Sequence, residues 1–211
     1  TLAAWITAHP LVLIDGYAGI FWDKVQAALD REFTGMGLKI KWHRTGDFLK
    51  DAGSIQDLVS PFIGNEGDVW GTKTTLDITD FFEMEKLASL SFDGPYDHHI
   101  VIGTGAALTH APAPLIYLDI PKNELQYRMR AGTITNLGCA HTYGATEMYK
   151  RFYFVDWVVL NAHKQKLLPR IHIMADTQWP ENIAWAFCSD LLAGIRQITR
   201  SSFRVRPWFE A

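Results

Sequence analysis

The stretch that decides the fold of this chain is residues 97–130, DHHIVIGTGAALTHAPAPLIYLDIPKNELQYRMR. Its two apolar runs, residues 99–102 and 115–120, are too short for helices and rich in Ile, Val, Leu and Tyr, so we predict two buried strands. After Pro121, two apolar residues recur four positions apart among charged residues, which predicts a helix over residues 122–130. The stretch therefore predicts a strand, a turn of small residues, a second strand and a basic helix.

Strands that are apolar on both faces are typical of parallel sheets covered by helices, so the predicted fold is α/β with three layers. Ligands of such sheets bind beyond the carboxyl ends of the strands, here residues 103–107 and 119–121. The patterns elsewhere predict strands over residues 11–14, 38–43, 150–160 and 171–174, helices over residues 20–33, 47–60, 76–90 and 181–196, and loops over residues 61–75 and 131–146.

The composition is that of a globular protein, most simply a single domain over residues 1–211, with 48% hydrophobic and 20% charged residues. The net charge of −3 provides no basic field for nucleic acid, and no apolar run reaches the roughly 18 residues of a membrane span. We therefore expect neither nucleic acid nor a membrane as a partner. The two cysteines give no disulfide framework, which favours a reducing, cytoplasmic setting.

A glycine turn follows the first predicted strand and precedes a helix, at Asp15, Gly16 and Gly19. Backbone N–H groups at such a turn can cradle a phosphate. The motif G-x-x-x-x-G-K-[ST], counted from Gly16, would need Gly, Lys and Ser or Thr where the chain has Phe, Trp and Asp23, although Lys24 lies close by. Two interpretations stay open: a degenerate phosphate loop, or glycines that only make the turn.

Other candidate motifs are incomplete. Residues 71–75 (GTKTT) lack the spacing of a phosphate loop, and residues 103–108 lack the last glycine of a dinucleotide fingerprint. The histidines at 98–99 would point to opposite faces of a strand, and Cys139 and His141 lack two further ligands at a recognisable spacing. We therefore predict no metal site.

A basic set comprises Arg128, Arg130, Lys150 and Arg151. Arginine grips phosphate with two parallel hydrogen bonds, so the set could bind an anion, and a solvated basic face explains it equally well. Because Arg128 and Arg130 cannot share one helix face, we expect at most one of them, Arg128, to aim at the crevice.

Residues 11–33 and 96–132 resemble the small-molecule kinases of the P-loop superfamily, which act on nucleosides, gluconate or uridine. The shared features are Tyr96-Asp97, the run IYLDIP over residues 116–121 and the following arginines. The resemblance implies a P-loop-kinase-like fold, with ATP and Mg²⁺ as a possible cofactor. From the strand ends, the glycine turns and the nearby charges we expect a phosphate or nucleotide to be bound by Asp15, Gly16, Gly19, Asp23, Lys24, Gly103, Thr104, Arg128 and Arg130. The stretch rich in Gly, Thr and Asn over residues 132–144 would close over the ligand as a flap.

The whole chain, and particularly residues 149–157 and 204–209, also resembles the N-terminal region of long bacterial proteins related to class I mannose-6-phosphate isomerases. In those proteins a cupin domain with the zinc and the isomerase chemistry follows. Because the chain starts without Met and ends in an aromatic segment, we expect a piece of a longer polypeptide. The resemblance then implies an accessory domain that has the downstream cupin domain as a partner.

The leading expectation is a domain that binds a nucleotide or sugar phosphate without phosphoryl transfer, because the lysine and the Mg²⁺ ligand of the motif are missing. One alternative is an active sugar or nucleoside kinase in which Lys24 or Lys73 replaces the lysine and Asp15 or Asp23 holds the metal. Another is a structural domain that pairs with the cupin or with a second copy of itself. Its evidence is aromatic residues typical of interfaces: Trp157, Trp179, Trp185, Trp208 and Phe209.

Overall fold

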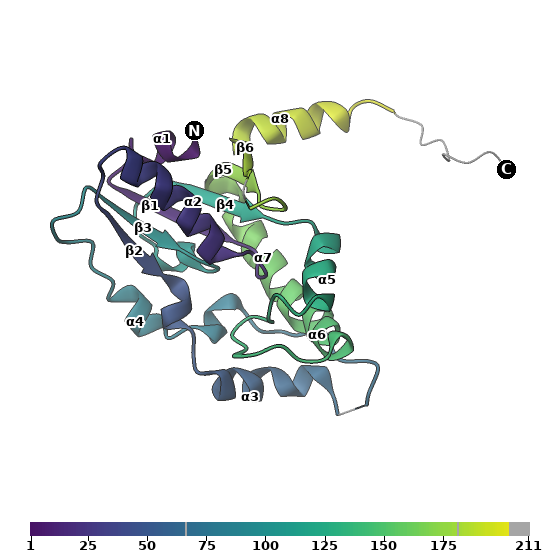
Figure 1. Cartoon of the computed structure of the whole chain (residues 1–211). Helices are drawn as coiled ribbons and strands as arrows, with labels where there is room; N and C mark the ends of the chain where they lie inside the picture. The colour runs from purple at the N-terminus through teal and green to yellow at the C-terminus, as the bar shows by residue number, and fades with distance from the viewer. Residues whose placement is uncertain (66, 181, 203–211) are drawn as a thin grey trace.

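The computed structural model describes residues 1–65, 67–180 and 182–202, and its centre is a six-stranded sheet in the order β2-β3-β1-β4-β5-β6 (Figure 1). Five strands run parallel and β6 pairs antiparallel with β5 at one edge. The strands are β1 (Leu11–Gly16), β2 (Ile40–Arg44), β3 (His98–Ile102), β4 (Leu115–Asp119), β5 (Ile171–Asp176) and β6 (Ala184–Phe187).

Helices cover both faces of the sheet (Figure 1). They are α1 (Leu2–Ile6), α2 (Trp22–Gly35), α3 (Ala52–Ile63), α4 (Met84–Ala88), α5 (Lys122–Arg130), α6 (Ala145–Arg151), α7 (Trp157–Leu167) and α8 (Cys188–Ile198). Alternate residues of β1 separate the layers: Val12 and Ile14 join the core that includes α1 and α2, whereas Leu13 joins a second core with Leu167 at the end of α7. The predicted α/β fold with helices on both faces is confirmed and is compatible with a P-loop-like fold.

The central strand β1 lies between β3 and β4. After β1, the chain first forms β2 and β3 on one side of it and then β4 on the other side. The connection from β3 to β4 therefore crosses from one side of β1 to the other. In open α/β sheets such a reversal creates a crevice at the carboxyl ends of the strands. The central stretch predicted from the sequence, with its two strands and the helix α5, is confirmed.

The strand predicted over residues 150–160 is wrong, because these residues are helical. They connect α6 to α7 through a π-helical segment, Phe152–Asp156. A short apolar run fits a buried helix as well as a strand, and here Phe152, Val155 and Leu160 are all buried. A π turn inside a helix is frequent at functional sites. In this one, Asp156 accepts a hydrogen bond from Asn136 in the loop that covers the cavity described below.

Three further predictions need correction. The helix expected over residues 76–90 consists of two short pieces, a 3-10 turn at Ile78–Phe81 and the helix α4. The helix expected over residues 47–60 consists of a 3-10 turn at Thr45–Phe48 followed by α3, which continues through Pro61. The last predicted helix contains the edge strand β6 before α8, while Glu181 lies outside the described residues. No helix in the described part of the chain has the length and apolar character needed to cross a membrane.

Candidate functional site

A cavity of about 740 Å³ lies at the carboxyl ends of β1, β2 and β3, where the topology predicts a ligand site. Phe21 and Trp22 line it and leave this volume open. It is lined by residues 18–23, Gln26, Arg44, Thr45, Gly46, Asp47, Leu49, Ile102, Gly103, Thr104, residues 132–138 and residues 140–142. A volume of this size accommodates a small molecule.

The roof of the cavity is the loop between α5 and α6, which contributes residues 132–138 and 140–142. Buried side chains of the neighbouring helical segment anchor this loop. Asn136 donates to a carboxylate oxygen of Asp156 at 2.6 Å, and the guanidinium of Arg151 donates to the carbonyl of Leu137 and to the Sγ of Cys139. The flap predicted over residues 132–144 therefore lies over the crevice, as expected, and is fixed near its middle.

The charge pair beneath the roof consists of Arg151 and Asp156, whose Nε and Oδ1 atoms are 3.5 Å apart. Both side chains are buried. Burial raises the pKa of the Asp156 carboxyl, and the Arg151 guanidinium and the hydrogen bond from Asn136 only partly oppose this rise. Burial likewise raises the pKa of the Cys139 thiol, so that this cysteine is held as a neutral thiol.

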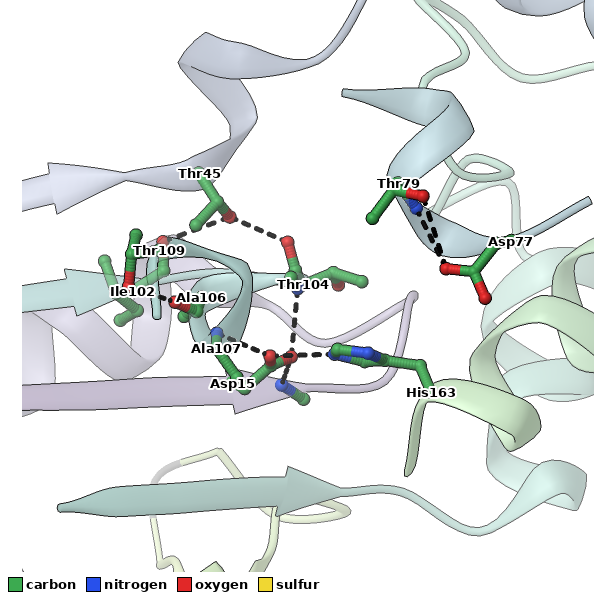
Figure 2. Close-up of polar contacts among 12 residues, drawn as sticks. Asp15, Thr45, Asp77, Thr79, Ile102, Thr104, Ala106, Ala107, Thr109 and His163 are labelled. Atoms are coloured by element: carbon green, nitrogen blue, oxygen red, sulfur yellow. Dashed lines mark hydrogen bonds and ion pairs between the residues drawn. The ribbon is translucent and has the colours of Figure 1, made fainter. Parts of the chain in front are cut away.

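The floor of the site is organised by Asp15, whose carboxylate is fully buried and lies among backbone N–H groups (Figure 2). It accepts hydrogen bonds from the backbone of Gly16 at 2.6 Å, of Gly105 at 2.9 Å and of Ala107 at 2.9 Å. The Nε2 atom of His163 on α7 lies 2.9 Å from Oδ2 of the Asp15 carboxylate. The expectation that Asp15 binds phosphate or a metal needs correction, because these donors already occupy both oxygens and the residue does not line the cavity.

Two threonines lie on the cavity wall, Thr104 in the turn after β3 and Thr45 at the start of the 3-10 turn after β2 (Figure 2). The Thr45 hydroxyl donates to the carbonyl of Thr104 at 2.9 Å and lies where a Cβ on Gly103 would meet it at 2.0 Å. Gly103 also has a φ of +131°, so only glycine fits there. Thr104 as a residue is 7% exposed, and its hydroxyl has no hydrogen-bond partner among the described residues. This hydroxyl is not one of the fully buried, unpartnered polar atoms of the described residues, so it is accessible to a ligand in the cavity.

The N-terminus of α2 forms another wall. Its N-cap is Phe21, and no side chain in the described ranges caps the helix. The N–H groups of Trp22 and Lys24 donate to the carbonyls of Ile20 and Phe21, so this end attracts an anion mainly through the helix dipole. Asp23 in the first turn forms an ion pair with Arg44 at 2.9 Å, and both line the cavity. Lys24 does not line the cavity, and its ammonium lies 4.9 Å from the centre of the Phe21 ring.

The two arginines of α5 do not reach the cavity. Arg128 is buried and donates to the carbonyls of Gly19, Thr177 and Gln178 while pairing with Glu124 at 2.9 Å. The expectation that Arg128 binds the ligand therefore needs correction, because its donors hold the loop after β1 in place. Arg130 is exposed and is likewise outside the lining.

Of the predicted binding residues, Gly19, Asp23, Gly103 and Thr104 line the cavity. Asp15, Gly16, Lys24, Arg128 and Arg130 do not. A Cβ on Gly16 would lie 2.6 Å from the Leu118 carbonyl, so this glycine serves close packing of the chain. The sequence patterns did not indicate Arg44 and Asp47 as cavity residues or His163 as the partner of Asp15, whereas Thr133, Thr135 and Thr142 belong to the predicted flap. Arg44, Asp47 and His163 lie far in sequence from the glycine turns, although Arg44 directly follows the strand predicted over residues 38–43.

Among the described residues, no group of three or more His, Cys, Asp or Glu side chains is arranged to hold a metal ion. His99 stacks on His43, with 3.1 Å between their ring nitrogens, and burial lowers the pKa of both rings. The basic residue Lys150 donates to the carbonyl of Asp68, away from the cavity.

Fold and site together define a class: an α/β domain with a doubly wound, mostly parallel sheet and a flap-covered cavity at the topological switch point. The chain belongs to the family described as Domain of unknown function (DUF8485), whose model matches residues 1–200. No curated protein matches the sequence.

Among solved structures, the chain is similar to the 54 kDa protein of the signal recognition particle from Aeropyrum pernix K1 in complex with GDP. The identity is 14% and the TM-score 0.30, with 90% of this chain and 46% of that chain covered. This chain thus spans less than half the length of that protein, and a likeness at this level carries no argument about function.

Proposed function

We propose that this domain binds one small phosphorylated molecule, a sugar phosphate or a nucleotide with a single phosphate, in the cavity beneath the flap. The observation that carries the proposal is the cavity itself, which lies at the switch point and has the unpartnered Thr104 hydroxyl on its wall. The N-terminus of α2 adds its dipole to the binding of an anion, and the threonines of the roof supply hydroxyls for a polar ligand.

The charges on the wall limit the ligand to a low negative charge. Among the described lining residues the cationic or titratable basic groups are Arg44 and His141, and they stand against Asp23 and Asp47. Arg44 is already paired with Asp23. A triphosphate would meet little compensating charge, whereas one phosphate would share Arg44 with Asp23 and lie at a helix N-terminus.

Phosphoryl transfer is not part of this proposal. It depends on charges placed around the transferred group, and neither Lys24 nor Lys73 lines the cavity. The carboxylate of Asp15 is enclosed by its own hydrogen bonds. The alternative of an active kinase therefore has no specific observation in its favour, and an assay of ATP consumption with sugars and nucleosides tests it directly.

The accessory role rests on the sequence resemblance to proteins related to mannose-6-phosphate isomerases, and it remains part of the proposal. It places a cupin domain after this one and connects the bound ligand with carbohydrate metabolism. Sedimentation of the chain alone and with such a cupin domain tests the association, and the absence of any shift would contradict the accessory role.

The binding proposal is tested by isothermal titration calorimetry with a hexose 6-phosphate, the free hexose, a nucleoside monophosphate and Mg-ATP. We expect one of the monophosphates to bind, and Thr104→Val to weaken its binding about fivefold to tenfold, which corresponds to roughly 1 kcal/mol for one hydrogen bond. Thr109→Val is the matched control, because the Thr109 hydroxyl lies on the same turn but bonds the Ala106 carbonyl. Equal binding by Thr104→Val, or tight Mg²⁺-dependent binding of ATP, would contradict the proposal.

A further inference from the structure

The helix α8 leaves most of its surface without a partner in the described chain. Cys188 is its only buried residue, and the helix extends away from the sheet edge (Figure 1). Leu191, Ile195 and Ile198 are exposed, and their spacing of four and three residues places them along one stripe. An isolated helix of 11 residues is marginal in water, so this stripe needs a surface to cover it.

The strand β6, directly before α8, carries a second group of exposed apolar side chains, and one of them, Trp185, lies on the side of the sheet covered by α1 and α2. It is the last strand of the sheet, pairs only with β5 among the described strands, and all of its residues are exposed. Trp185 and Phe187 lie on one face of it, with ring centroids 5.8 Å apart, and Trp179 nearby in the chain is 67% exposed. An exposed edge strand with large apolar side chains is a template for pairing with another strand.

The exposed apolar side chains of Trp179, β6 and α8 together reach the size of a protein interface. The exposed fractions of three aromatic and three aliphatic side chains amount to roughly 600 Å² of apolar area per copy, which approaches the roughly 800 Å² that each partner buries in a stable complex. Patches of this size on a soluble protein mark interaction sites.

We propose that this surface, Trp179, β6 and the stripe of α8, is the interface between two copies of this chain. A two-fold axis next to β6 pairs the strand antiparallel with its own copy, which satisfies the free edge of both sheets at once. The charges of α8 fit the same symmetry. Its first turn carries Asp190 and its last turn Arg196, so an antiparallel arrangement places the acidic end of one helix beside the basic end of the other.

The test is sedimentation velocity of the 211-residue chain over a concentration series, for the parent and for Ile195→Glu. We expect a dimer for the parent and at least a tenfold weaker association for Ile195→Glu, because a charge replaces an apolar contact in the centre of the interface. Gln197→Glu is the matched control, since it adds the same charge to the same helix on its opposite, polar face. Circular dichroism of both variants verifies that the fold is retained.

A parent that stays monomeric over the whole series would overturn the proposal and would indicate that another domain or protein covers the surface. A dimer that persists in Ile195→Glu would also overturn it, since the interface would then lie elsewhere. The ligand experiments above are independent of this outcome, because the cavity and α8 share no lining residue.

Discussion

The floor and the roof of the cavity are each held by one fully buried aspartate, and the two carboxylates are stabilised differently. Asp15 in the floor accepts three backbone hydrogen bonds and contacts His163. Asp156 beneath the roof accepts from Asn136 and, at 3.4 Å, from the backbone of Leu137. Its Oδ1 makes no hydrogen bond within the described residues and lies 3.5 Å from Nε of Arg151. The floor is therefore the rigid part of the site, and the roof is held by a pair that is easier to release.

The largest expected effect is that of Asp15→Ala in the floor. The substitution leaves the N–H groups of Gly105 and Ala107 and the ring of His163 buried without an acceptor, so we expect a loss of about 3–5 kcal/mol of unfolding free energy. Urea denaturation measures it. Asp23→Ala removes an exposed ion pair as the control and should cost less than about 1 kcal/mol. Equal losses for the two variants would contradict the comparison.

A smaller effect is expected for Arg151→Leu under the roof. Asp156 can take up a proton when its partner is lost, so we expect about 2–3 kcal/mol, together with faster proteolysis within residues 131–144. The double variant Arg151→Leu with Asp156→Leu should recover part of the loss, because no unpaired charge remains. Lys150→Leu on the same helix is the control. A roof that stays as resistant as the parent in Arg151→Leu would refute the anchoring role.

The pH dependence of the folding stability gives a further test of how Asp156 is held beneath the roof. Burial raises the folded-state pKa of Asp156 above its ordinary value of about 3.9, so the stability that this carboxyl contributes is greatest below that value and falls as the pH rises through the raised pKa. We therefore expect Asp156→Asn to cost more stability at pH 4 than at pH 7 in urea denaturation. Asp77→Asn should show the opposite sign, because the hydrogen bond from Lys166 lowers the pKa of Asp77.

The smallest effect on stability is expected for Thr104→Val. The Thr104 hydroxyl has no partner among the described residues, so its loss should change the unfolding free energy by less than about 0.5 kcal/mol. Thr45→Val on the same wall removes a buried hydroxyl that bonds the Thr104 carbonyl and should cost about 1–2 kcal/mol. A large loss for Thr104→Val would show that this hydroxyl serves the fold, which would leave the ligand site without its main polar group.

Sequence patterns alone determined the sheet and its central strands. The apolar runs of β1, β3 and β4 and the glycines between strand and helix predicted a mostly parallel α/β fold. The ends of β1 and β3 predicted where the cavity lies, whereas residues 119–121 after β4, which were also expected there, do not line it. These features are local, because a buried strand needs consecutive apolar residues and a left-handed turn such as that at Gly103 needs glycine. The flap over the crevice was also predicted, since a stretch rich in Gly and Thr has no periodicity of its own.

Only the tertiary structure decided which side chains meet. Asp15 and His163 lie 148 residues apart, and the pairing of Arg128 with the Gly19 carbonyl spans 109, so no local pattern could show that these charged groups serve the scaffold and not a ligand. The segment 150–160 became a helix for the same reason. Its apolar residues suit a strand or a buried helix equally, and the choice depends on packing against elements far away in the sequence, which also places Asp156 beneath the roof.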